Sequence, residues 1–156
     1  MTSQTLREAR KYEEASEKMI KKEERPDFHL SVRTGWMNDP NGFSYYNGNY
    51  HMFYQYYPYD SIWGPMHWGH AVSKDLLHWK YLPAALAPDE IYDRDGCFSG
   101  SAIDLPDGRQ LLMYTGVLQE RKLNGGVCDI QTQCLAVGDG VDYEKYEKNP
   151  VLDASD

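Results

Sequence analysis

Residues 36–57 read WMNDPNGFSYYNGNYHMFYQYY, and this stretch joins a constrained acidic segment to a β-hairpin pattern. Pro40 disfavours a helical backbone at Asp39 and pushes that residue into an extended conformation. Asn41 and Gly42 tolerate positive φ, so they predict a chain reversal that presents the Asp39 carboxylate at a strand end. A run of this composition is also typical of an ordinary surface turn.

The second half of the stretch predicts a β-hairpin. Phe43–Tyr46 and Tyr50–Tyr57 are rich in aromatic residues that favour strands. They flank Asn47-Gly48, a pair that favours a two-residue type I′ turn. Because side chains alternate along a strand, Gln55 is expected on the same face as Phe53.

The layout around this hairpin occurs twice along the chain. The first copy comprises Gly42, Met52–Gln55, Ala71–Asp75, Trp79 and Pro83. The second comprises Gly100, Leu112–Thr115, Ala136–Asp139, Tyr143 and Pro150. The displacement of roughly 58 to 67 positions is near the length of a four-stranded propeller blade with long loops. Since a propeller closes with about four to eight blades, we expect an all-β fold comprising the first two to two and a half blades of a longer propeller.

The segment before Pro26 has a different character. Thr5–Glu24 is rich in Glu, Lys, Ala and Arg and shows helical periodicity, and Pro26 ends that pattern. We therefore expect residues 1–25 to form a helical arm and residues 26–156 to form the N-terminal part of a β-propeller domain. The arm would either bind a partner or pack along a thin apolar stripe. The stripe comprises Leu6, Ala9, Tyr12, Ser16 and Met19.

Composition narrows the class of ligand. The formal net charge of −8 disfavours nucleic acid and anionic membranes as partners. Aromatic residues make up 13% of the chain, with 13 Tyr and 4 Trp. These rings combine apolar faces with hydrogen-bonding groups. That mixture suits a small carbohydrate.

Cysteine usage and hydropathy predict the compartment. Cys97, Cys128 and Cys134 are odd in number and lack paired spacing, so a disulfide framework is not indicated. The first 24 residues lack the apolar core of a signal peptide, and nowhere do eighteen apolar residues follow one another. We expect a cytoplasmic protein.

Histidines and serines invite two further interpretations. His67 and His70, with His51 and His78, do not have a usual zinc spacing, so we expect packed or hydrogen-bonded imidazoles. We predict neither a metal nor a cofactor. Ser99-Gly100-Ser101 lacks the surroundings of a nucleophile elbow and is expected to form a turn that lines a pocket.

Five ordered motifs carry a family resemblance: Trp36–Gly42, Tyr50–Pro58, Trp63–His70, Asp75–Trp79 and Gly96–Ala102. Together they resemble family 32 of the glycoside hydrolases, which includes invertases, sucrose-6-phosphate hydrolases, levanases and inulinases. The similarity runs from about His29 to Leu152. The amino-acid sequence of these motifs is most similar to that of bacterial intracellular sucrose-6-phosphate hydrolases.

The resemblance implies a five-bladed β-propeller followed by a β-sandwich, with a funnel at the propeller axis that holds a terminal fructose. It implies hydrolysis of terminal non-reducing β-D-fructofuranosides, such as sucrose, sucrose 6-phosphate or short fructans, by a retaining mechanism with Asp39 as nucleophile. The fructose subsite would be lined by Trp36, Met37, Asn38, Gln55, Trp63, Phe98 and Ser99.

A retaining glycosidase needs a second carboxyl group. In the family this acid/base is the Glu of a Glu-Cys pair in a later blade, and an Arg-Asp-Pro triplet supplies a transition-state stabiliser. Neither motif occurs here, because Gly96, Val127 and Gln133 precede the cysteines and Arg94-Asp95 is not followed by proline. We therefore expect activity in a longer parent and none in the 156-residue chain alone. The alternatives are a noncatalytic truncated fragment or fructose-binding module, and a fructosyltransferase.

Overall fold

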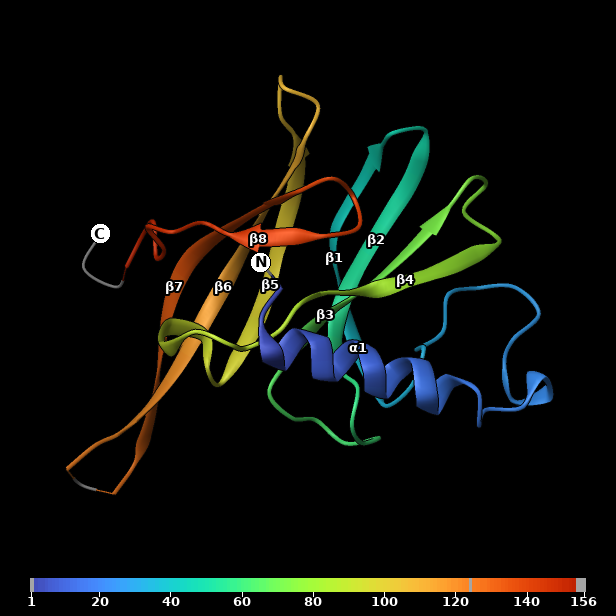
Figure 1. Ribbon diagram of the computed structural model, residues 1–156. Coiled ribbons are helices and arrows are strands. Elements are labelled where there is room, and N and C mark those ends of the chain that lie inside the picture. The colour runs from blue at the N-terminus through green and yellow to red at the C-terminus, as the bar shows by residue number, and fades with distance from the viewer. Residues whose placement is uncertain (1, 124, 154–156) are drawn as a thin grey trace.

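The computed structural model describes residues 2–123 and 125–153, whose strands form two four-stranded antiparallel sheets (Figure 1). The first sheet comprises β1 (Trp36–Tyr46), β2 (Asn49–Tyr57), β3 (His67–Ser73) and β4 (Trp79–Leu86). The second comprises β5 (Gly96–Asp104), β6 (Gln110–Arg121), β7 (Val127–Gly138) and β8 (Tyr143–Lys145). In each sheet the strands lie in chain order. The predicted all-β pair of blades is confirmed.

The two copies of the sequence layout occupy equivalent strands. Met52–Gln55 lies in β2 and Leu112–Thr115 lies in β6, the second strand of each sheet. Trp79 begins β4 and Tyr143 begins β8, the fourth strand of each sheet. The spacing of the repeat therefore corresponds to one blade.

The predicted hairpin is also confirmed. Asn47 and Gly48 connect β1 to β2 with φ angles of 47° and 73°. Both central residues of a type I′ turn require positive φ, which asparagine and glycine tolerate best. Tyr46 pairs with Asn49 on either side of the turn.

The chain reversal predicted at Asn41 and Gly42 is wrong. β1 runs through both residues, and Gly42, with φ of 50°, lies at a register shift between β1 and β2. A Cβ on Gly42 would lie 2.8 Å from the ring of Phe53. The glycine therefore serves a β-bulge and a close approach to a side chain, neither of which reverses a strand.

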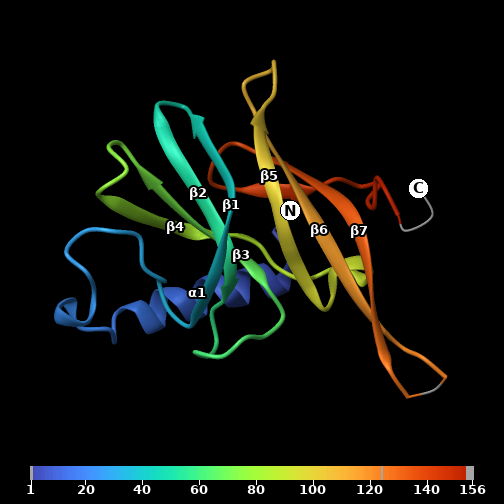
Figure 2. The ribbon, with the colours of Figure 1, turned by 180° about the vertical axis from the view of Figure 1, so that it is seen from behind.

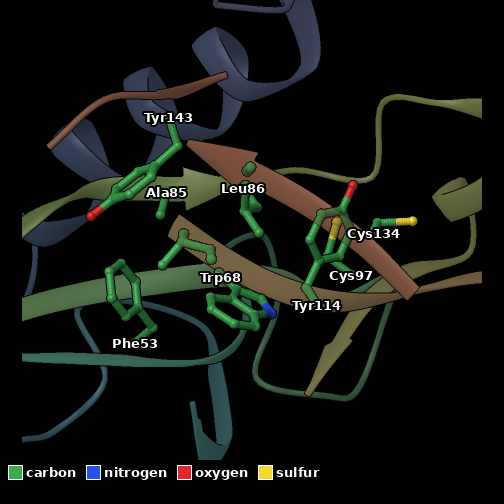
Figure 3. Packing of buried hydrophobic residues seen from close by; sticks show 10 residues of the cluster. Phe53, Trp68, Ala85, Leu86, Cys97, Tyr114, Cys134 and Tyr143 are labelled. Carbon is green, nitrogen blue, oxygen red and sulfur yellow. The ribbon is translucent and has the colours of Figure 1, made fainter. Parts of the chain in front are cut away.

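The main hydrophobic core lies between the two sheets (Figure 3). Phe53 and Trp68 from the first sheet face Tyr114 and Cys134 from the second. The other buried members are Ala85, Leu86, Cys97, Leu112, Ala136 and Tyr143. Burial of these apolar surfaces holds the sheets together.

The cysteines are free, as the sequence predicts. Cys97 and Cys134 are fully buried small members of this core, whereas Cys128 is half-buried.

The N-terminal helix is shorter than the sequence predicts. α1 spans Gln4–Glu17, and a separate 3-10 turn, η1, spans Lys22–Glu24. Between them, Met19 and Ile20 donate to carbonyls three residues earlier, which tightens and ends the helix. Among the residues that the structure covers, no helix is long and apolar enough to cross a membrane.

α1 packs beside β4 (Figure 1). Its residue Leu6 joins a second apolar cluster on the other face of the first sheet. The predicted apolar stripe is only partly right, because Met19 is 82% exposed. The buried residues of α1 are Leu6, Ala9 and Glu13, so a charged residue takes part in the buried face. The Glu13 carboxylate bonds Arg33 and the backbone N–H of Ala84, each at 2.9 Å. Such partners allow a charge to leave water.

Candidate active site

The first strands of the two sheets, β1 and β5, lie side by side (Figure 2). Each contains a β-bulge near its start. In β1, Asn38 and Asp39 oppose the single residue Gln55 of β2. In β5, Ser99 has no partner in register on β6. A bulge re-aims side chains out of the regular alternation. Here the two bulges bring Ser99 Oγ to 3.1 Å from Asp39 Oδ2, to which it donates.

The Asp39 carboxylate is oriented on both oxygens. Asn38 Nδ2 donates to Asp39 Oδ1 at 3.3 Å, and Trp36 Nε1 donates to Asn38 Oδ1 at 2.8 Å. Asn38, Asp39 and Ser99 are all exposed. The carboxylate is therefore fixed in direction but accessible to a ligand.

The fructose-sized hollow that the resemblance predicts is not enclosed by these two blades, since Asp39 lies on their exposed side. The physical reason is that the blades of a propeller surround a central channel, so two blades can form only part of its wall.

Gln55 lies beneath the site and is only 3% exposed. Its Nε2 donates to the carbonyl oxygen of Cys97 at 3.0 Å. Asn41, which is also buried, completes this contact. With its amide oriented so that both atoms are satisfied, Asn41 accepts from Gln55 Nε2 at 3.0 Å and donates to the Pro40 carbonyl at 3.2 Å. The sequence indicated only a turn residue at Asn41, because the bulge that buries it was not visible there.

Trp63 and Phe98 supply aromatic surface. Trp63 is 51% exposed, and its ring meets that of Phe98 edge-on with centroids 6.2 Å apart. Met37 is placed differently, because its half-buried side chain packs against the second apolar cluster with Tyr54 and Tyr56. Asn38 and Ser99 thus bond Asp39 directly, and Trp36 reaches it only through Asn38. Gln55 and Trp63 contact β5, the strand that contains Phe98 and Ser99, whereas Met37 packs elsewhere.

The backbone of β5 at the site is held by side chains from three other strands. Cys97, Phe98 and Ser99 each offer a carbonyl that accepts one side-chain hydrogen bond. The donors are Gln55 Nε2 at 3.0 Å, Trp68 Nε1 at 3.1 Å and Thr115 Oγ1 at 3.2 Å, respectively. This support was not visible in the sequence, because it depends on how the two sheets meet.

Three of the histidines are packed between strands, as the sequence predicts. His51 Nδ1 lies 3.0 Å from His70 Nε2 in a buried pair, and His67 is also buried. Burial lowers the pKa of all three imidazoles. His78 is exposed and pairs with Asp75. Within the described ranges, no group of three or more His, Cys, Asp or Glu side chains is arranged to hold a metal ion.

Consecutive four-stranded antiparallel sheets with adjacent first strands define the chain as part of a β-propeller protein. The sequence model described as "Glycosyl hydrolases family 32 N-terminal domain" matches residues 29–156. The chain therefore belongs to glycoside hydrolase family 32.

Relatives of known activity match part of their length. The chain is 49% identical over 144 residues to a sucrose-6-phosphate hydrolase from Zymomonas mobilis subsp. mobilis. The aligned region covers 88% of this chain and 27% of that protein. The chain is also 53% identical over 122 residues to a raffinose invertase from Escherichia coli, which covers 77% of this chain and 25% of the relative. The chain thus spans about a quarter of the length of these relatives.

Solved structures of family 32 enzymes are also similar to this chain over part of their length. A family GH32 β-fructofuranosidase from Bombyx mori superposes with a TM-score of 0.83 at 46% identity, covering 95% of this chain and 30% of that one. A variant of that enzyme in complex with sucrose gives a TM-score of 0.85 at 44% identity, covering 98% of this chain and 32% of that one.

Proposed function

We propose that this chain contributes two blades and the nucleophile of an enzyme that hydrolyses terminal non-reducing β-D-fructofuranoside bonds. Sucrose, sucrose 6-phosphate and short fructans are the proposed substrates. Membership of family 32, the activities named for its relatives and the sucrose complex of a structural neighbour support this function. The observation that carries it is the Asp39 carboxylate, which accepts a hydrogen bond on each oxygen where two bulges face one another.

In the proposed reaction, Asp39 attacks the anomeric carbon of fructose and forms a covalent fructosyl-enzyme. Water then hydrolyses this intermediate, so that two inversions retain the configuration. Ser99 and Asn38 orient the carboxylate, while the exposed ring of Trp63 offers apolar contact to the sugar. A second carboxyl group must protonate the leaving oxygen and later activate water. The family resemblance assigns that role to a Glu-Cys pair, which does not occur in these 156 residues.

We also propose that residues 1–25 are an arm fastened to the propeller domain of residues 26–156. Arg10 supports this division of the chain, because its guanidinium donates to the Ala84 carbonyl at 2.9 Å and to Asp142 at 2.6 Å. These contacts join α1 to β4 of the first sheet and to the loop between β7 and β8 of the second. The proposed location is the cytoplasm, which the three free thiols support.

The proposed role of Asp39 is tested by the substitution Asp39→Asn in the full-length protein. The amide keeps the shape of the side chain but cannot form the fructosyl ester, so we expect kcat for sucrose to fall by about 10⁴-fold or more. Asp107→Asn is the matched control, because Asp107 is exposed and lies between β5 and β6. Turnover by Asp39→Asn at the rate of the control would refute the proposed function.

A further inference from the structure

A chain of hydrogen bonds leads from β7 through β6 to the Asp39 carboxylate. Gln133 Nε2 donates to Thr115 Oγ1 at 3.1 Å, and Thr115 Oγ1 donates to the Ser99 carbonyl at 3.2 Å. Ser99 Oγ then donates to Asp39 Oδ2 at 3.1 Å. A threonine hydroxyl has one proton and two lone pairs, so Thr115 can accept from Gln133 and donate its single proton to the Ser99 carbonyl.

This chain of hydrogen bonds, here called the relay, runs from Gln133 through Thr115 and Ser99 to Asp39. It meets β5 at the bulge, where the backbone pairing between β5 and β6 is interrupted. Phe98 pairs with Thr115 and Gly100 pairs with Tyr114, so Ser99 is the extra residue of the β5 bulge. A bulged residue is left out of the ladder of backbone hydrogen bonds. The Thr115 side chain supplies a bond to the Ser99 carbonyl in its place, which restrains the peptide from which the Ser99 hydroxyl projects.

Gln133 is itself anchored. Its backbone N–H donates to the Leu152 carbonyl at 2.8 Å, and its own carbonyl accepts from Val151 at 2.8 Å. The segment that follows β8 thus bridges back onto β7 at this residue. The far end of the relay is therefore fixed to the segment that follows β8.

We propose that Thr115 and Gln133 are positioning residues for the nucleophile: they hold Ser99 so that its hydroxyl orients the Asp39 carboxylate. This inference rests on the proposed function of Asp39. Thr115 and Gln133 act through Ser99, so their loss reduces the fraction of time that the carboxylate is aligned for attack. The consequence is a loss in kcat with little change in KM.

The test begins with Thr115→Val in the full-length protein, which removes the hydroxyl at nearly constant volume. We expect kcat for sucrose to fall about tenfold, with KM within about twofold of the wild-type value. Thr115→Ser keeps a hydroxyl and is expected to recover most of the lost kcat. Gln133→Leu is expected to lower kcat in the same manner.

Thr132→Val is the matched control. Thr132 lies next to Gln133 on β7, but its hydroxyl faces Cys134 Sγ at 3.7 Å and takes no part in the relay. We expect wild-type kcat from this variant. A general intolerance of valine in these strands would lower kcat in both threonine variants and would overturn the proposal.

A double-mutant cycle decides whether Thr115 acts through Ser99. If it does, Thr115→Val causes no further loss of kcat once Ser99→Ala is present. Additive losses, or wild-type kcat in a folded Thr115→Val variant, would overturn the proposal. If Thr115→Val does not fold, the same cycle with Gln133→Leu decides. An active Asp39→Asn variant would instead refute the proposed function, whereas an inactive Asp39→Asn with a fully active Thr115→Val refutes the relay alone.

Discussion

The carboxylate of Asp39 receives one hydrogen bond from Asn38, its chain neighbour, and one from Ser99, which is sixty positions away. The first contact depends only on local backbone geometry. The second depends on two bulges in different sheets that place Ser99 against Asp39. The orientation of this carboxylate therefore combines a local restraint with one that forms only when the sheets pack.

His67 illustrates how burial changes the chemistry of a single side chain. Its Nδ1 lies 3.0 Å from the Pro65 carbonyl, and its Nε2 has no hydrogen-bond partner in the described part of the chain. Burial lowers the pKa of His67 to about 4. In the unfolded chain a histidine titrates near 6.5. The folded protein therefore resists a proton that the unfolded chain accepts.

We expect the free energy of unfolding to decrease as the pH falls from about 6.5 to about 4. In that window the unfolded state binds more protons than the folded state, and His67 contributes about 1.4 kcal/mol per pH unit. The variant His67→Gln should show a shallower decrease in urea unfolding measured across this range. Equal slopes for wild type and His67→Gln would contradict this prediction.

The bulged strands β1 and β5 depend on glycines where their backbones come close to neighbours. Gly100 follows the bulged Ser99, and a Cβ at this position would lie 1.9 Å from the backbone carbonyl oxygen of Met113. A backbone atom cannot turn aside as a side chain can. Strand β5 therefore tolerates only glycine at this position unless it moves away from β6.

For Gly100→Ala we expect the free energy of unfolding to fall by about 2 to 3 kcal/mol, because β5 must shift against β6. Gly108→Ala provides the comparison, since Gly108 has φ of 84° but a Cβ there would meet nothing within 4 Å. That substitution costs only the left-handed conformation, about 1 kcal/mol. Chemical unfolding of both variants measures the difference. A loss at Gly100 no larger than at Gly108 would show that β5 relaxes freely.

A buried cluster of charges joins distant parts of the whole molecule. Lys145 on β8 donates to Asp89 and Asp93, which lie between β4 and β5, and Tyr114 on β6 donates to Asp93 at 2.8 Å. Ser3, the N-cap of α1, donates to Asp89. Burial alone would lower the pKa of Lys145, but interactions with Cys97, Asp93 and Asp89 outweigh it and raise that pKa. The ammonium group therefore stays charged within the fold.

Removing this charge is expected to destabilise the molecule. Lys145→Met leaves two carboxylates without their cation at a site where the lysine is 13% exposed, so we expect a loss of about 3 kcal/mol or more in the free energy of unfolding. Arg109→Met removes an ion pair with Asp107 at the exposed end of β5 and should cost much less. Urea unfolding of both variants is the measurement. Similar losses would contradict the assigned role of Lys145.

Some parts of the fold are predicted correctly from the sequence and others are not. The Asn47-Gly48 hairpin and the two-blade layout follow from backbone preferences and alternation, which are properties of residues close in the chain. The helix was predicted too long, and the buried Glu13 was not foreseen. Its burial depends on Arg33 and Ala84, which only the packed structure brings near.

The order of residues along the chain was enough to predict its strand-rich character and its two blades, both of which the structure confirms. Through the family motifs it also predicts Asp39 as the nucleophile, which stays a prediction. Three further features emerged only from the packed sheets: Gly42 lies in a bulge, Met37 packs away from Asp39, and Thr115 supports Ser99. The difference arises because local conformation depends on neighbours in the chain. Strand register and contacts between sheets depend on which residues meet after both sheets have formed.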